Sequence, residues 1–236
     1  IKMKALVLEK KLDLKLRDIN LPTQVGSDDV KIKMHTVGIC GSDIHYYEHG
    51  KIGQWKVNEP MVLGHEGSGT VIDVGKNEKI LKIGDRVCIE PQVVSKKTKE
   101  YKLGIYNYDQ KVKFWATPPI HGCLTPEVVF PGDMVFKIPD SLSYAEGAMV
   151  EPLAVGMQGV TKAQIKPGQI GLVMGCGPIG LVTALAALAG GCSKVYIADI
   201  LSEKLKICEH YSGLVPVNLS KENLSEKIMN DTNGWG

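Results

Sequence analysis

Short runs of alternating apolar and polar residues fill roughly the first 140 positions of the chain, and glycine, proline and aspartate separate them. Alternation with a period of two puts every second side chain on one face, which is typical of half-buried β-strands. Short strands separated by turns favour a small β-barrel or β-sandwich. The runs predict strands at residues 4–10, 29–38, 67–75, 85–90 and 133–139.

The pattern becomes helical over residues 143–163. Ser143 and Glu146 have the spacing of a capping box, in which two side chains satisfy the first free N–H groups of a helix. Pro152 suits the first position of a second helix, where its missing N–H costs little. We therefore expect two successive helices in this stretch.

From Gly168 onward, strand-like and helix-like segments alternate. Apolar runs predict strands at 169–175, 194–199 and 214–218, with helices over 178–190 and 202–211. This alternation indicates a parallel sheet covered by helices. A complete doubly wound dinucleotide fold has about six strands, and three are visible before Gly236, so we expect the natural protein to continue past that residue.

The composition is that of an ordinary globular protein, with 44% hydrophobic and 23% charged residues. A net charge of +2 is too small to indicate nucleic acid or an anionic membrane as the main partner. The longest apolar run, 181–189, is too short to span a bilayer, and the N-terminus lacks the apolar core of a signal peptide. The six cysteines contain no C-x-x-C pair, so we expect reduced thiols and a cytoplasmic protein.

Residues 175–180 read GCGPIG, which matches the dinucleotide-binding pattern G-x-G-x-x-G. An apolar strand precedes the motif, a helix follows it, and Asp199 ends the next strand, as this kind of site requires. A carboxylate there would bind the adenosine ribose hydroxyls and repel a 2′-phosphate, which favours NAD over NADP. The alternative is a plain glycine turn with Asp199 as a helix cap. The predicted cofactor-binding residues are Gly175, Gly177, Pro178, Ile179, Gly180, Asp199 and Lys204.

Three short stretches in the first two thirds of the chain carry candidate metal ligands. Cys40 lies just before a predicted helix start, His65 and Glu66 lie among glycines, and Glu151 lies at another helix start. Each stretch alone is weak evidence for a metal site, because a single cysteine, for example, is usually a small buried apolar residue.

Taken in order, several motifs resemble the zinc-dependent medium-chain dehydrogenases, and within them the sorbitol/xylitol (polyol) dehydrogenase branch. The motifs are GICGSDIHYYEHG, MVLGHEGSG, KIGDRVCIEP, ATPP, EGAMVEPLAVG and GCGPIGL. Glu151 is the most specific sign, since alcohol dehydrogenases of this family have a cysteine ligand there. The resemblance implies an α/β protein with a GroES-like β-rich catalytic domain at 1–146, followed at 147–236 by the first half of an NAD-binding Rossmann-type doubly wound parallel sheet.

The resemblance also implies a catalytic zinc ion held by Cys40, His65 and Glu66, with a water in the fourth place and Glu151 hydrogen-bonded to that water. Three protein ligands and one open position are what a catalytic zinc needs. The expected reaction is oxidation of a polyol to a ketose: the zinc-bound hydroxyl loses its proton, and the resulting alkoxide passes hydride to the nicotinamide.

Four further residues are candidates for roles near the metal. Ser42, two residues after Cys40, would relay the proton outward, or act as an ordinary helix cap. By resemblance, Tyr46, Ile52 and Phe114 would line the substrate pocket, or simply pack.

Residues 93–113 carry six lysines against two acids. Binding of nucleic acid through this run is one reading, but the segment has no recognised nucleic-acid fold and no arginine-rich face. In many zinc-dependent relatives the segment is a lobe that binds a second, structural zinc through four cysteines. Those positions fall on Ser95, Thr98, Tyr101 and Asp109 here, so we expect one zinc per subunit and no structural zinc.

Two alternatives to a xylitol or sorbitol dehydrogenase remain open. One is a sister enzyme acting on L-arabinitol, threonine or glucose, and the other is a non-catalytic NAD-binding relative. The sequence does not say which polyol or which carbon is oxidised. The resemblance implies a homo-oligomer, a dimer or a tetramer, whose partner is a small-molecule polyol.

Overall fold

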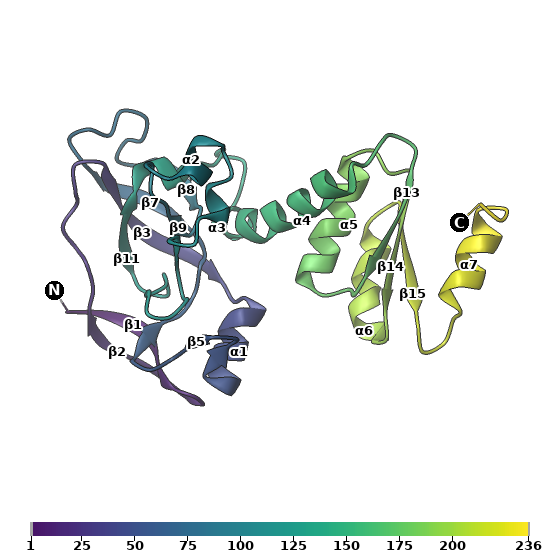
Figure 1. Cartoon of the computed structure of the whole chain (residues 1–236), viewed down its shortest axis with the longest axis horizontal. Coiled ribbons are helices and arrows are strands. Elements are labelled where there is room, and N and C mark those ends of the chain that lie inside the picture. The colour runs from purple at the N-terminus through teal and green to yellow at the C-terminus, as the bar shows by residue number, and fades with distance from the viewer. Residues whose placement is uncertain (1, 236) are drawn as a thin grey trace. The chain divides into compact units, whose positions relative to one another are not determined.

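The computed structural model describes residues 2–235, and the chain folds as two compact units, Ile1–Glu151 and Pro152–Gly236 (Figure 1). The domain boundary that we expected after residue 146 lies inside helix α3 (Tyr144–Ala148). Helix α4 (Val150–Ala163) begins in the first unit and continues into the second.

The first unit is built mainly of antiparallel strands. Its largest sheet has the order β11-β3-β7-β8-β12, with β11 at Glu127–Pro131, β3 at Asp29–Gly38, β7 at Glu66–Val74, β8 at Arg86–Ile89 and β12 at Val135–Lys137. A second sheet has the order β2-β1-β6, with β2 at Asp13–Asn20, β1 at Lys2–Lys10 and β6 at Met61–Val62. Two short pairs complete the strands: β4 (Lys51–Ile52) with β5 (Trp55–Lys56), and β9 (Gln92–Val93) with β10 (Lys113–Phe114). The helical elements besides α3 are α1 (Gly41–His49), α2 (Lys99–Lys102) and the 3₁₀ turns η1 (Tyr106–Tyr108) and η2 (Gly132–Met134).

The core of this unit follows from the alternation along the strands. On β3, Val30 and Ile32 are fully buried, whereas Lys33 points to solvent. They pack in one apolar cluster with Trp115 and Phe130, whose ring centroids lie 4.3 Å apart. The predicted strands over 4–10, 29–38, 67–75 and 85–90 correspond to β1, β3, β7 and β8, whereas β2 and β11 were not predicted.

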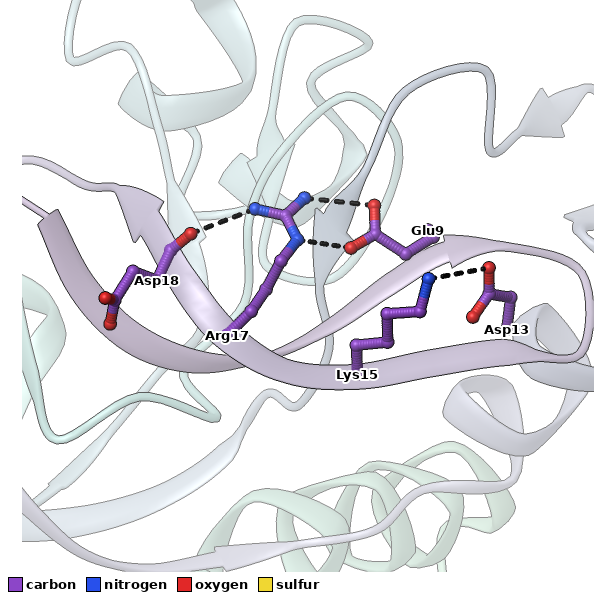
Figure 2. Close-up of polar contacts among 5 residues, drawn as sticks. All are labelled: Glu9, Asp13, Lys15, Arg17 and Asp18. Carbon is purple, nitrogen blue, oxygen red and sulfur yellow. Dashed lines mark hydrogen bonds and ion pairs between the residues drawn. The ribbon is translucent and has the colours of Figure 1, made fainter.

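Charged side chains cover the β1–β2 hairpin, whose outer strand β2 is an edge of its sheet (Figure 2). Arg17 forms a bidentate pair with Glu9, and one of the two bonds, from Nη2 to Oε2, measures 3.0 Å. Lys15 Nζ lies 3.3 Å from a carboxylate oxygen of Asp13. Such partly exposed pairs contribute little stability, but charges on an edge strand discourage pairing with another chain.

The second unit is a parallel sheet with the order β13-β14-β15 and helices on both faces (Figure 1). Its strands are β13 (Ile170–Met174), β14 (Lys194–Asp199) and β15 (Leu214–Asn218); its helices, besides α4, are α5 (Pro178–Ala189), α6 (Ser202–Leu205), the 3₁₀ helix η3 (Lys206–His210) and α7 (Leu224–Asp231). β14 is buried on both sides: Val195 and Ile197 pack in one apolar cluster, and Tyr196 and Ala198 pack in another.

The order of strands and helices predicted for residues 169–218 is confirmed. The one local difference is the helix predicted over 202–211, which ends as an α-helix at Leu205 and continues as a 3₁₀ helix. Turns of the 3₁₀ type are frequent at the ends of α-helices. Within residues 2–235, none of the helices combines the length and apolar character needed to cross a bilayer.

Candidate metal centre and dinucleotide-binding loop

Strand register brings the three predicted metal ligands together. Gly38, the last residue of β3, pairs with Glu66, the first residue of β7. Cys40 follows two residues after β3 as the N-cap of α1, and His65 directly precedes β7. The Cys40 sulfur, a His65 ring nitrogen and a Glu66 carboxylate oxygen consequently all lie within 4.8 Å of one another.

The surroundings of these three side chains fit a metal ion. His65 and Glu66 are only 6% and 8% exposed. His65 Nδ1 is buried and has no hydrogen-bond partner among the described residues, although buried polar atoms are nearly always paired. Thiolate, imidazole and carboxylate are ligands that Zn²⁺ accepts in proteins. A Cβ atom at position 38 would lie 2.1 Å from Glu66 Oε2, so glycine is needed there for the carboxylate to enter the cluster.

Burial shifts the protonation equilibria of the acidic groups in and beside the cluster. Burial raises the pKa of the Cys40 thiol, against hydrogen bonds with Ser42 that lower it. Burial likewise raises the pKa of Glu66 and of Glu151, and the Glu151 carboxylate interacts with the charges of both His65 and Glu66. A bound divalent cation reverses this balance, because it favours thiolate and carboxylate over their protonated forms.

Asp43 is a residue of this centre that the sequence reasoning missed. Its side chain is 2% exposed. Oδ2 accepts a hydrogen bond of 3.0 Å from the Cys40 N–H, and Oδ1 accepts one of 2.9 Å from the Gly64 N–H. One carboxylate thus joins the two loops that carry the metal ligands. The spacing from 40 to 43 is that of a capping box, but Cys-x-x-Asp departs from the usual Ser/Thr-x-x-Glu/Gln pattern, so the sequence carries little sign of it.

The predicted substrate-pocket residues fall in two places. The Phe114 ring meets the His65 ring edge to face, with centroids 5.4 Å apart. Tyr46 is 3% exposed within an apolar cluster that includes Met61, and Ile52 packs against the same cluster. Ser42 lies in the first turn of α1, where it lowers the pKa of the neighbouring Cys40 thiol. Of the three pocket residues, Phe114 therefore contacts the metal centre directly.

The GCGPIG loop lies between β13 and α5, at the carboxyl end of the strand. Gly175 has a φ of +99°, and a Cβ at position 180 would lie 1.9 Å from the Gly175 carbonyl oxygen. A Cβ at position 177 would meet no atom within 4 Å. The first and third glycines thus close the turn against the helix, and the second leaves open space where a phosphate can approach the backbone. Pro178 occupies the first turn of α5, and the side chain of Ile179 is exposed.

Asp199 ends β14 and faces this loop. Its Oδ1 accepts a hydrogen bond of 2.9 Å from the Leu201 N–H, and its Oδ2 accepts one of 2.8 Å from the Cys176 N–H. These two bonds lower its pKa, and the charge of the exposed Lys204 acts in the same direction. The carboxylate is therefore ionised and fixed beside the second residue of the glycine loop.

The lysine-rich segment 93–113 contains more regular structure than its sequence suggested. Thr98 caps helix α2 by accepting a hydrogen bond of 3.3 Å from the Tyr101 N–H. Tyr106 donates a hydrogen bond of 3.2 Å to Glu90. Asp109 is 6% exposed and accepts a bond of 2.9 Å from the Lys111 N–H. Local hydrogen bonds therefore hold the lobe.

Comparison with known proteins agrees with the fold. The family model for the alcohol dehydrogenase GroES-like domain matches residues 26–140. D-xylulose reductase of Morganella morganii is 56% identical over 235 residues, which is 99% of this chain and 69% of that protein. Sorbitol dehydrogenase of Rattus norvegicus is 43% identical over 218 residues, which is 92% of this chain and 61% of that protein.

Among solved structures, an Escherichia coli oxidoreductase/dehydrogenase of unknown specificity superimposes with a TM-score of 0.92 at 35% identity, and the match covers 100% of this chain and 68% of that one. The predicted fold class, a GroES-like unit followed by a Rossmann-type parallel sheet, is thereby confirmed. The chain belongs to the zinc-dependent medium-chain dehydrogenases, in their polyol dehydrogenase branch.

Proposed function

We propose that this protein is an NAD-dependent polyol dehydrogenase, which oxidises a secondary hydroxyl of a xylitol-type or sorbitol-type substrate to the ketone. The observation that carries the proposal is the buried cluster of Cys40, His65 and Glu66, with the Glu151 carboxylate close to it. Relatives with 56% and 43% identity are a D-xylulose reductase and a sorbitol dehydrogenase, which supports a polyol as the substrate.

Cys40, His65 and Glu66 would hold the catalytic zinc. When bound, zinc supplies Lewis-acid chemistry that lowers the pKa of a substrate hydroxyl, so that its proton is lost near neutral pH. Asp43 keeps the ligand loops in register, because its two oxygens bind backbone N–H groups on both sides of the centre. The orphaned Nδ1 atom and the mixed donor set of these side chains support this assignment.

Five further side chains serve the substrate. Glu151 accepts a hydrogen bond from the reacting hydroxyl and so orients it for transfer of hydride. Phe114, whose ring packs against His65, excludes water from the reacting carbon. Ser42, next to the Cys40 sulfur, passes the released proton outward through its hydroxyl. Tyr46 and Ile52 shape the pocket wall from the apolar cluster beneath α1.

The dinucleotide binds at the GCGPIG loop, with its pyrophosphate on the open side of Gly177 at the start of α5. The ionised Asp199 carboxylate has lone pairs left for the two ribose hydroxyls, since each oxygen accepts one backbone bond. The same charge repels a 2′-phosphate, so we propose NAD as the cofactor, with Lys204 at the edge of the site.

We also propose one zinc ion per subunit. The tetrathiolate positions of zinc-containing relatives fall on residues without thiols here, Ser95, Thr98, Tyr101 and Asp109. In the described part of the chain, the Cys40 cluster is the one group of three or more histidine, cysteine or acidic side chains close enough to share an ion. The dimeric or tetrameric assembly and the cytoplasmic location expected from the sequence stay predictions.

The test is NADH formation from xylitol, sorbitol and L-arabinitol, with threonine, glucose and NADP in parallel arms. We expect activity with at least one polyol and NAD, and its loss with a chelator. Cys40→Ala should bind no zinc and be inactive, whereas Cys88→Ala, the same change at a buried cysteine outside the cluster, should keep both. Turnover by Cys40→Ala, or by the zinc-free protein, would contradict the proposal. Higher activity with threonine or glucose than with the polyols would show that the proposed substrate is wrong, and higher activity with NADP than with NAD would show that the proposed cofactor is wrong.

A further inference from the structure

Two thiols meet beneath the dinucleotide loop. Cys176 lies between Gly175 and Gly177, and Cys208 lies in η3, the helical turn after α6. Their sulfur atoms are 3.7 Å apart, and the two residues are 5% and 1% exposed. A disulfide bond is about 2.05 Å long, so the thiols touch and are not bonded. Bond formation requires the sulfurs to approach by roughly a further 1.6 Å.

The backbone around Cys176 has little freedom to follow such a movement. The Cys176 N–H donates a hydrogen bond of 2.8 Å to Asp199, and the Gly175 N–H donates one of 2.7 Å to the Ala198 carbonyl. The Cys176 thiol itself donates to the Lys204 carbonyl at 3.3 Å. A displaced Cys176 would break or lengthen these bonds. The N–H groups that the loop offers to a phosphate would then be rearranged.

We propose that Cys176 and Cys208 form a reversible disulfide that distorts the GCGPIG loop and thereby weakens dinucleotide binding. This regulatory role rests on the proposed NAD-dependent function. The crosslink would join the loop after β13 to the element after β14, which are 32 residues apart in the chain. The crosslink therefore acts on the cofactor site and includes none of the proposed metal ligands.

A hydroperoxide is the oxidant that the chemistry requires. The Cys176 sulfur, the more exposed of the two, attacks one oxygen of hydrogen peroxide; the O–O bond breaks, and sulfenic acid and water form. The Cys208 sulfur then displaces the sulfenic hydroxyl as a second water. Two electrons pass from the two sulfurs to the peroxide, and a dithiol reverses the change by thiol–disulfide exchange.

Burial makes the reduced pair slow to react. It raises the pKa of Cys208 to about 12, and the neighbouring Cys176 thiol adds to the effect. Since the thiolate is the reactive form, the raised pKa slows the second step, in which the Cys208 sulfur displaces the sulfenic hydroxyl.

Mass mapping tests the crosslink. The protein is treated with hydrogen peroxide, unfolded, alkylated and digested, and we expect a peptide pair linked through Cys176 and Cys208 that dithiothreitol separates. The intact mass should fall by two hydrogen atoms. Cys208→Ala should form no such link, whereas Cys192→Ala, a matched change at a buried cysteine in the same unit, should still form it. Absence of the link, or linkage of another pair, would overturn the proposal.

Two readouts test its consequence. NAD titration should give a dissociation constant at least about 10-fold higher for the crosslinked protein. Amide hydrogen exchange over residues 175–180 should become faster on oxidation, and this readout needs no NAD. A reduced protein that fails to bind NAD would refute the proposed function. In that case the amide hydrogen exchange of residues 175–180 would still test whether the disulfide distorts the loop. A crosslinked protein with unchanged exchange or unchanged NAD affinity would overturn the inference.

Discussion

Replacing Asp43 with asparagine tests how the metal centre is held together. The carboxylate accepts two backbone bonds, of 3.0 Å from Cys40 and 2.9 Å from Gly64, and the residue is 2% exposed. Hydrogen bonds to charged groups contribute about 1.5–3 kcal/mol each. Asparagine keeps one acceptor oxygen and turns an NH₂ group toward the second N–H. We therefore expect Asp43→Asn to lose one such bond and to leave a buried donor unpaired, a total of about 2–4 kcal/mol.

The loss should be measurable by urea unfolding followed through tryptophan fluorescence. Trp55 and Trp115 both lie in the first unit, so most of the signal reports on the unit that contains Asp43. With an m-value of about 1–3 kcal/mol per molar urea, the midpoint should fall by about 1 M or more. Zinc affinity should fall about 10–100-fold, as expected when a residue that orients metal ligands is changed.

Asp73→Asn is the matched control. This aspartate is exposed, and its carboxylate accepts a bond of 2.8 Å from the adjacent Val74 N–H. Its replacement should change stability by no more than about 0.5 kcal/mol. If Asp43→Asn unfolded at the same urea concentration as Asp73→Asn and held zinc as tightly, the bridging role assigned to Asp43 would be wrong.

Three further predictions concern the dinucleotide loop, the β1–β2 hairpin and the metal. Gly180→Ala should destabilise the protein by about 2–4 kcal/mol, since its Cβ would lie 1.9 Å from the Gly175 carbonyl oxygen, whereas Gly177→Ala meets no atom within 4 Å and should weaken NAD binding alone. Thermal scans and NAD titrations separate the two, and equal effects would contradict the roles given to these glycines. The hydrogen bond from Arg17 lowers the pKa of Glu9 below its ordinary value of 4.5. Arg17→Ala should therefore be less stable than the unchanged protein above pH 4.5, and this difference in stability should vanish as the pH falls through the lowered pKa. A difference in urea midpoint that persists in acid would argue against this pair. Protein stripped of zinc by a chelator should melt about 5–10 °C below protein in which free zinc is at a hundredfold excess over its dissociation constant. A melting temperature that changes with neither chelator nor added zinc would show that no ion is bound.

Local patterns predicted most of the secondary structure because the signal is itself local. β3 alternates buried valine and isoleucine with lysine, and β14 is an uninterrupted buried run, as expected for a strand covered on both faces. The edge strand β2 was missed. Leu14 and Leu16 on this strand are exposed and Ile19 is partly buried, so the strand exists mainly through its pairing with β1.

The residue types along the chain specify the chemical identity of the site. It contains a thiol, an imidazole and carboxylates in the motif order of the family, and glycines where the dinucleotide loop needs them. Side-chain type is a property of each residue alone, so this information survives without coordinates. Tertiary structure decided which groups meet: the pairing of Gly38 with Glu66 brings ligands 25 residues apart into one cluster, and Asp43 bridges their loops. It also placed Cys176 against Cys208. Such distances depend on the register between strands and on packing, whose energy is the sum of many weak contacts between distant segments. No single segment of the sequence specifies either of them.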